Sequence, residues 1–281
     1  MKTETECQSL SVNRINFASR QHNKMSRIKK LFEIKNKNIL SVYFTAGFPS
    51  LNSTLTVMKS LQDAGADMIE LGIPYSDPLA DGPVIQSSGT VALANGMTIA
   101  HLFKQLKNFR DKIQLPVLFM GYMNPIMQYG FENFCRDAAD AGVDGLILPD
   151  LPMFEFEKEF GATVSKFNLD FVFLVTPETE ETRLRKLDQL SSGFIYAVSS
   201  SSTTGKAAAL SDQEKYFERL QTMKLQNPVL IGFGIRDRSS FSQACTYASG
   251  AIIGTAYIKV LENATEQEIP ARTMEFINSL K

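Results

Sequence analysis

The sequence contains no tryptophan, only two histidines and only three cysteines among its 281 residues. Neither His22 nor His101 lies near Cys, Asp or Glu residues with the spacing of a metal site, so we expect no metal site and no Ser-His-Asp triad. Three widely separated cysteines do not form a disulfide framework, and we predict that Cys135 and Cys245 are buried thiols. This cysteine usage is typical of a reducing compartment and predicts a cytoplasmic location.

The sequence also has no excess of charge and no long apolar run. Lys and Arg total 29 against 30 Asp and Glu, and no basic block is present, which argues against a nucleic-acid partner. No run approaches the roughly 18 apolar residues of a membrane-spanning helix, so we expect no membrane association. With 44% hydrophobic and 21% charged residues, the chain has the composition of a soluble globular protein of one large or two small domains.

Residues 1–24 differ from the rest of the chain. They mix Ser, Asn, Gln and Arg without apolar periodicity and have no hydrophobic segment of the kind found in secretory signals. We predict a disordered N-terminal extension. The alternatives are an Arg- and Ser-containing transit peptide, or a start codon assigned too early, with Met25 as the true first residue. Residues 25–281 then form the folded domain.

From residue 25 onward, short apolar runs alternate with segments in which apolar residues recur at helical spacing. The phrases DAGAD at 63–67 and DAGVD at 140–144 each predict a helix that ends at a glycine in the left-handed conformation, followed by a strand. The eight predicted strands are 39–44, 68–71, 117–120, 145–148, 171–175, 194–198, 229–231 and 251–253.

Eight near-continuous apolar strands, each followed by a helix, predict a parallel sheet covered by helices. The count of eight and a core of about 250 residues favour an α/β fold of the (β/α)8 TIM barrel type, as a single domain, over an open sheet. An open dinucleotide-binding sheet would have a glycine-rich turn after its first strand, and TAGFP at 45–49 lacks that turn. In a barrel, the long segments after the second and sixth strands lie at the carboxyl-terminal face, where active sites form.

Glycine turns follow the last two predicted strands. IGFGI occupies 231–235 and Gly254 precedes Thr255, so backbone N–H groups at these turns can hold an anion. Gly205, after the sixth strand, is placed to complete the cradle. The alternative is that these glycines only permit tight turns. The loops after strands seven and eight are the usual phosphate site of such barrels, which predicts a small phosphorylated substrate.

The segment ELGIPYSDPLADGP, residues 70–83, places one carboxylate in a strand and others in a proline-rich loop. Strand alternation puts Glu70 on the face opposite Ile69, so Glu70 points into the barrel if Ile69 packs against the helices. A carboxyl group in apolar surroundings can exchange protons near neutral pH. Three prolines stiffen the loop that carries Asp81. The alternative for Glu70 is a glutamate that is only hydrogen-bonded at a strand end.

With these motifs in place, residues 25–281 resemble the tryptophan synthase alpha subunit family. The resemblance implies a lyase that cleaves indole-3-glycerol phosphate to indole and glyceraldehyde 3-phosphate by acid/base-assisted retro-aldol chemistry, in L-tryptophan biosynthesis and without a cofactor of its own. It also implies a pyridoxal-phosphate beta subunit as partner, in an α2β2 heterotetramer. Besides 70–83, the matching motifs are TAGFP at 45–49, MGYMNP at 120–125, LILPDLP at 146–152 and GFGI at 232–235.

The resemblance assigns catalytic roles to three residues. Glu70 protonates the indole ring at C3 and removes the proton of a glycerol hydroxyl, and Asp81 accepts a hydrogen bond from the ring N–H. Tyr196 matches the active-site tyrosine of the family, with packing in the barrel wall as the alternative. No predicted strand carries a lysine, which agrees with chemistry that needs no lysine imine. The phosphate contacts that carry over are Gly205, Gly232, Phe233, Gly234, Gly254 and Thr255.

Two loops complete the implied site. SSSSTTG at 199–205 lacks the arginine that the family often has there, so the sequence does not decide whether this lid closes in the usual way. The resemblance implies that Thr204 can still reach Asp81. The resemblance also predicts contacts with the beta subunit at Pro74, Asp77, Asn124 and Pro125. The alternative is that these residues are only surface prolines and a loop-capping aspartate.

Two other functions fit parts of this pattern. One is a sugar-phosphate isomerase or epimerase on the same barrel, and the other is a catalytically silent subunit that activates a partner enzyme. The presence of both Glu70 and Asp81 argues against each of them.

Overall fold

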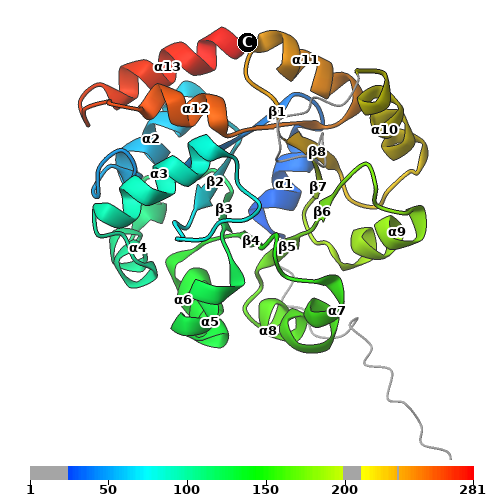
Figure 1. Cartoon of the computed structure of the whole chain (residues 1–281), viewed down its shortest axis with the longest axis horizontal. Coiled ribbons are helices and arrows are strands. Elements are labelled where there is room, and N and C mark those ends of the chain that lie inside the picture. The colour runs from blue at the N-terminus through cyan, green and yellow to red at the C-terminus, as the bar shows by residue number, and fades with distance from the viewer. Residues whose placement is uncertain (1–24, 199–209, 233) are drawn as a thin grey trace, which may run out of the picture.

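The structure, a computed structural model, describes residues 25–198, 210–232 and 234–281. Residues 1–24, with the predicted extension, therefore lie outside the described part. The strands form a parallel ring at the centre of the molecule, and the helices lie around it (Figure 1). The strands are β1 (Ile39–Thr45), β2 (Met68–Gly72), β3 (Val117–Met120), β4 (Gly145–Ile147), β5 (Asp170–Val172), β6 (Leu174–Val175), β7 (Ile195–Val198), β8 (Val229–Gly232) and β9 (Gly250–Ile253).

The ring is continuous because β5 and β6 are two parts of one strand, separated only by Phe173. β5 pairs with β4, and β6 pairs with β7. β1 pairs with both β2 and β9, so parallel pairing runs around the whole sheet. The nine segments are thus the eight predicted strands, and the prediction of a single (β/α)8 barrel is confirmed.

Helices follow the strands around the outside of the ring. Gly65 ends α2 and Gly142 ends α6, with φ of 85° and 98°, as the two DAG motifs predict. The helices are α1 (Arg27–Ile34), α2 (Thr54–Ala64), α3 (Pro83–Ala94), α4 (Ile99–Gln105), the 3-10 helix η1 (Phe109–Asp111), α5 (Met123–Tyr129), α6 (Phe131–Ala141), α7 (Met153–Glu155), the π-helical η2 (Phe156–Phe160), α8 (Gly161–Lys166), α9 (Glu181–Leu190), α10 (Leu210–Thr222), α11 (Arg238–Tyr247), α12 (Thr255–Leu261) and α13 (Ile269–Leu280).

Helix α1 closes the end of the barrel at which the strands begin. Ile28 is fully buried, and the ring of Phe32 packs 6.2 Å from that of Phe194, which immediately precedes β7. Arg27 Nη1 donates a 2.9 Å hydrogen bond to Asp144 Oδ1, just before β4. Since one end is covered in this way, an active site has to form at the carboxyl-terminal end.

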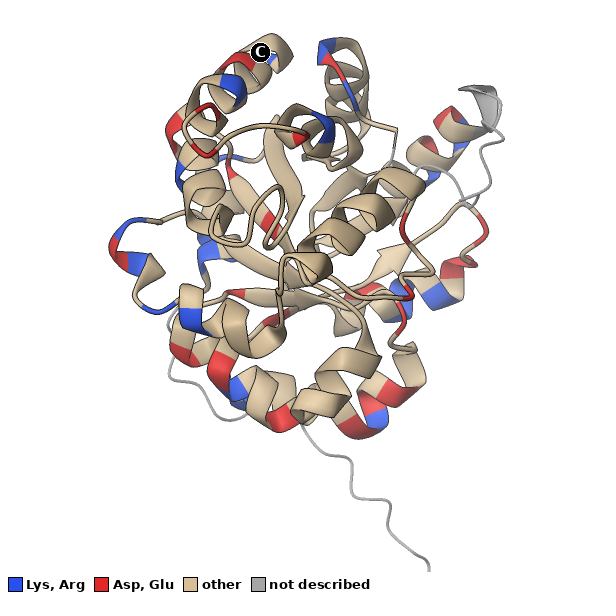
Figure 2. Ribbon diagram, turned by 60° about the vertical axis from the view of Figure 1, so that its left-hand side comes forward, with Lys and Arg blue, Asp and Glu red and all other residues tan. Residues whose placement is uncertain are grey.

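Charged residues lie mainly on the outer helices and loops, with both signs interspersed (Figure 2). Cys135 and Cys245 are buried, as predicted, and burial raises the pKa of the Cys135 thiol to about 12. None of the helices in the described ranges is long and apolar enough to cross a membrane.

Candidate active site

Glu70 points into the barrel from β2 and is completely buried. Its partner in register on β1 is Tyr43, and two residues earlier on β1 the hydroxyl of Ser41 donates a 2.8 Å hydrogen bond to Glu70 Oε1. The other carboxyl oxygen, Oε2, has no hydrogen-bond partner among the described residues. Burial raises the pKa of Glu70 to about 8, against a smaller lowering by the Ser41 hydrogen bond. Glu70 therefore holds a proton at neutral pH.

Asp81 lies in the loop between β2 and α3 and is only 8% exposed. The hydroxyl of Tyr122, just beyond β3, accepts a 3.1 Å hydrogen bond from the N–H of Ala80 and donates to the Asp81 carboxylate. Burial raises the pKa of Asp81 to about 6, and the Tyr122 hydrogen bond lowers it in part. Asp81 is therefore ionised under conditions in which Glu70 is protonated.

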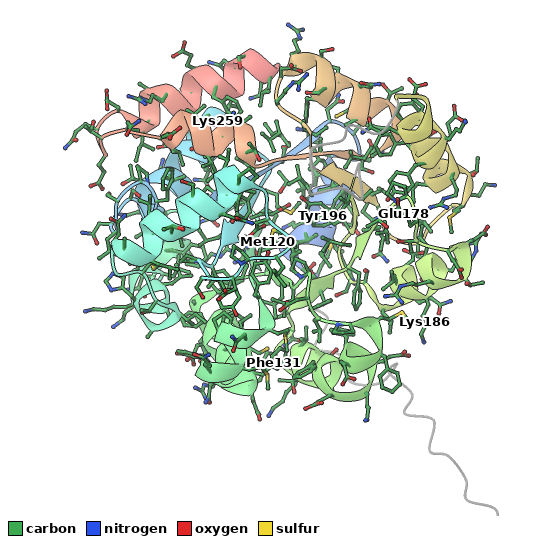
Figure 3. The ribbon with its side chains drawn as sticks, viewed as in Figure 1. Met120, Phe131, Glu178, Lys186, Tyr196 and Lys259 are labelled. Atoms are coloured by element: carbon green, nitrogen blue, oxygen red, sulfur yellow. The ribbon has the colours of Figure 1, made fainter. Side chains whose placement is uncertain are left out.

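A cavity of about 410 Å³ opens beside Asp81. Asp81, Tyr43 and Tyr196 belong to its walls. Figure 3 shows Tyr196 and Met120, another wall residue, near the centre of the ring and Lys259 on α12. Glu70 has no exposed surface, but its charge acts on both tyrosines, so it lies close behind them. A ligand in the cavity thus contacts Asp81 directly, whereas Glu70 lies behind the tyrosines of the wall.

Three of the six predicted phosphate contacts line the same cavity. Gly234, Gly254 and Thr255 belong to its walls, and Gly234 has a φ of +77° that favours glycine. Thr255 begins α12, where backbone N–H groups without helical partners are available to an anion. A Cβ at Gly232 would lie 2.4 Å from the hydroxyl of Tyr196, so this glycine makes room for the tyrosine ring.

Three predicted site residues, Gly205, Phe233 and the lid residue Thr204, lie outside the described residues. Of the predicted partner contacts, Asp77 and Asn124 are exposed, Pro125 is half-buried, and Pro74 is buried within this chain. Pro74 therefore packs inside this chain and presents little surface to a partner.

Two structural links connect the loop after β2 with α5. Asn124 Nδ2 donates a 2.8 Å hydrogen bond to the hydroxyl of Tyr75, and the rings of Tyr75 and Tyr122 pack 5.5 Å apart. The predicted contacts Asp77, Asn124 and Pro125 consequently belong to one continuous face of the barrel.

Sequence reasoning missed four residues of this site. Tyr43 could have been found from the alternation along β1, which places it on the same face as Ser41. The cations Arg236 and Lys259 also line the cavity, whereas the sequence analysis named only backbone N–H groups for the phosphate. Lys259 has no ion-pair partner among the described residues, and Arg236 Nε lies 3.5 Å from the carboxylate of its neighbour Asp237. The fourth missed residue is Tyr122.

In the part of the chain that the structure describes, no three His, Cys, Asp or Glu side chains are grouped in a way that could hold a metal ion.

Comparison with known proteins agrees with this geometry. The family model described as "Tryptophan synthase alpha chain" matches residues 29–280. The chain is 48% identical over 253 residues to the tryptophan synthase alpha chain of Parabacteroides distasonis, covering 89% of this chain and 98% of that protein. It is 50% identical over 246 residues to the alpha chain of Flavobacterium psychrophilum, covering 87% and 96%.

Solved structures give the same result. The alpha subunit of tryptophan synthase from Legionella pneumophila superposes with a TM-score of 0.82 at 34% identity, covering 91% of this chain and 97% of that one. A chain of the aminoacrylate-bound tryptophan synthase from M. tuberculosis gives a TM-score of 0.79 at 30% identity, covering 92% and 100%.

Proposed function

The chain belongs to the tryptophan synthase alpha chain family, and from this premise we propose which of its groups carry out the alpha reaction. That reaction is the carbon–carbon lyase step of L-tryptophan biosynthesis, in which indole-3-glycerol phosphate gives indole and glyceraldehyde 3-phosphate. The observation that carries the proposal is a pair of carboxyl groups with separated pKa values: Asp81, with a pKa of about 6, lines the cavity, and Glu70, with a pKa of about 8, is buried beside the wall residue Tyr43. Two carboxyl groups whose environments separate their pKa values are suited to different roles.

Glu70 acts as acid and then as base. Its protonated form donates the proton to C3 of the indole ring, and the ring becomes the electron sink for the bond to be broken. The resulting carboxylate takes the proton of the hydroxyl on the adjacent carbon of the side chain. As that oxygen forms the aldehyde, the electrons of the carbon–carbon bond return to the ring, and indole leaves. Oε2 is the oxygen that exchanges the proton, since Oε1 is held by Ser41.

Asp81 stabilises the positive charge that develops on the protonated ring. It is ionised at neutral pH, and as a carboxylate it accepts the hydrogen bond of the ring N–H. Tyr122 holds the Asp81 loop in place by contacting both Ala80 and the carboxylate. Tyr196 forms the wall of the cavity against which the ring packs.

The phosphate group binds where Gly234, Gly254 and Thr255 line the cavity. Backbone N–H groups at the first turn of α12 contribute fixed positive ends of dipoles. Arg236 and Lys259 add formal positive charge at the rim. An exposed cation is screened by salt, so we assign these two residues to capture of the substrate and the backbone to its orientation.

Alpha chains of this family work with a beta subunit, and we propose that the face around Asp77, Asn124 and Pro125 contacts it in an α2β2 complex. Leu79, in the same loop as Asp77, is 89% exposed, and Met127, on the same helix as Asn124, is 49% exposed. Large apolar side chains that remain exposed are typical of interaction surfaces.

The proposal is tested by incubating the purified chain with indole-3-glycerol phosphate and measuring indole release. Glu70→Gln and Asp81→Asn are each expected to reduce release by about two to four orders of magnitude while glyceraldehyde 3-phosphate still binds. A silent activating subunit would release no indole even when unmodified. Full activity of Glu70→Gln would remove the acid–base assignment.

A further inference from the structure

We propose that the hydroxyl oxygen of Tyr43 is a substrate-binding group that accepts a hydrogen bond from a hydroxyl of the substrate's three-carbon chain. The proposal rests on the proposed function and deepens it, because it names a contact that discriminates a hydroxylated side chain from an unsubstituted one.

Tyr43 is close to both carboxyl groups. It is the partner in register of Glu70, it lines the cavity that Asp81 lines, and it is 7% exposed. A Cβ at Gly72 would lie 2.2 Å from the Tyr43 hydroxyl, so the tyrosine oxygen sits directly over the backbone at the end of β2. Since Gly72 is two residues beyond Glu70 on β2, the hydroxyl lies one layer closer to the open end of the barrel.

A chain of buried hydroxyl groups fixes the direction in which Tyr43 donates. The hydroxyl of Ser88 donates to the carbonyl of Ile85 at 2.8 Å, and a carbonyl can only accept. The 2.7 Å contact between Ser88 and Thr45 must then use the hydrogen of Thr45. Because each hydroxyl has one hydrogen, the 3.5 Å contact between Thr45 and Tyr43 uses the hydrogen of Tyr43.

Tyr43 thus directs its hydrogen toward Thr45 and leaves its lone pairs for a ligand. Burial, and next the charge of Asp81, raise the pKa of Tyr43 above its ordinary value, so the hydroxyl keeps this hydrogen near neutral pH. The Tyr43 oxygen is then a neutral acceptor in a partly desolvated site. Its ligand has to be a donor, which excludes the phosphate oxygens.

The substrate offers three donors outside its phosphate, namely the ring N–H and two side-chain hydroxyls. The proposed function gives the ring N–H to Asp81 and the hydroxyl next to the ring to Glu70. One hydroxyl remains, and leaving a buried donor without an acceptor is unfavourable. Tyr43, the partner in register of Glu70 and a wall residue of the cavity that Asp81 lines, is an acceptor available for it.

The test compares two ligands by calorimetric titration in the Glu70→Gln background, where the substrate is not cleaved. The first ligand is indole-3-glycerol phosphate, and the second is an indole-3-propyl phosphate that lacks both hydroxyls. Adding Tyr43→Phe is expected to weaken the first ligand by about five- to tenfold, the equivalent of one hydrogen bond, and to change the second by less than about twofold. Equal weakening of both ligands, or no change in either, would overturn the proposal.

Two further variants separate this role from packing. Tyr257→Phe removes another buried hydroxyl, which lies 2.8 Å from the hydroxyl of Thr273 and does not line the cavity. This variant should leave the ratio of the two affinities unchanged. Thr45→Val removes the acceptor that directs Tyr43 and should reduce the ratio, whereas Thr45→Ser should restore it. A ratio that is the same in both Thr45 variants would contradict the directed chain. If neither ligand binds the Glu70→Gln protein, the proposed function itself fails.

Discussion

The hydroxyl of Ser41 holds Glu70 Oε1 at 2.8 Å while the opposite oxygen of the same carboxyl group has no partner among the described residues. A buried carboxylate with one hydrogen bond is poorly compensated, and protonation is the less costly state. The Ser41 contact therefore positions the Glu70 side chain but leaves Oε2 without a hydrogen bond, and this oxygen can carry a proton. The pH behaviour of the protein follows from this arrangement.

The first prediction is a bell-shaped dependence of kcat/KM on pH. The reactive form has Asp81 ionised and Glu70 protonated, so the rate rises as pH passes about 6 and falls as pH passes about 8. The measurement is indole release from indole-3-glycerol phosphate across this range. A rate that continues to rise above the upper value would show that Glu70 is needed as a carboxylate from the start.

Two variants identify the limbs of that profile. Ser41→Ala removes a hydrogen bond that lowers the pKa of Glu70, so the alkaline limb should move to higher pH while the acid limb stays in place. Tyr122→Phe removes the bond that lowers the pKa of Asp81, so the acid limb should move to higher pH. Movement of both limbs in either variant would contradict the assignment of one limb to each carboxyl group.

The second prediction concerns stability. The folded-state pKa of Glu70, about 8, exceeds its ordinary value of 4.5, so unfolding releases a proton between these values and the free energy of unfolding falls as pH rises. Glu70→Gln removes this slope of about 1.4 kcal/mol per pH unit. Between about pH 6.5 and 8, above the pKa of Asp81, the variant should gain on the order of 2 kcal/mol relative to the parent.

Urea unfolding of the two proteins at both pH values measures this difference. The control is Glu33→Gln, which changes an exposed glutamate of α1 and should leave the slope of the parent intact. Parallel pH dependence in the parent and in Glu70→Gln would show that Glu70 is not held protonated by the fold.

The third prediction contrasts two glycines. Alanine at Gly232 would place its Cβ 2.4 Å from the hydroxyl and a ring carbon of Tyr196, so Gly232→Ala should displace the tyrosine, destabilise the protein by about 1–3 kcal/mol and lower kcat/KM. Gly82 lines the same cavity at a φ of −76° with nothing within 4 Å of a Cβ, so Gly82→Ala should change stability by less than about 0.5 kcal/mol. Equal destabilisation would contradict the packing role of Gly232.

Much of this architecture was accessible from the sequence because it depends on local pattern. Apolar runs and glycine caps predicted all eight strands, and alternation along β2 directed Glu70 into the barrel on the condition that Ile69 packs against the helices. The resemblance placed Asp81 and Tyr196 beside it. Only the interruption of the fifth strand at Phe173, which divides it into β5 and β6, has no signal in the apolar pattern.

What the sequence could not supply are contacts between distant segments. The hydroxyl chain joins Thr45 to Ser88, 43 positions apart, and Tyr122 reaches Ala80 across 42 positions. The burial of Pro74 likewise depends on how its loop folds back. No period or motif encodes such pairs, because they are set by the register of neighbouring strands and by loop closure.

The fourth prediction addresses the partner face. Leu79→Glu puts a charge on a side chain that is 89% exposed and should weaken association with the beta subunit by at least about tenfold. Ile34→Glu makes the same change at a residue that is 78% exposed on α1, at the opposite end of the barrel, and should leave association unchanged. Titration of labelled beta subunit with each variant decides between them. Equal loss in both variants would remove the predicted face.

The fifth prediction concerns capture of the phosphate. Lys259 lines the cavity with an exposed side chain, so Lys259→Gln should raise the KM for indole-3-glycerol phosphate by roughly two- to fivefold at low salt and leave kcat nearly unchanged. The difference should disappear at about 1 M salt, where the screening length falls to about 3 Å. Lys107→Gln, at an exposed lysine outside the cavity walls, is the matched control and should leave KM unchanged at every salt concentration. A loss that persists at high salt would mean that Lys259 orients the phosphate by a direct hydrogen bond, and the division of labour between rim cations and backbone N–H groups would then be wrong.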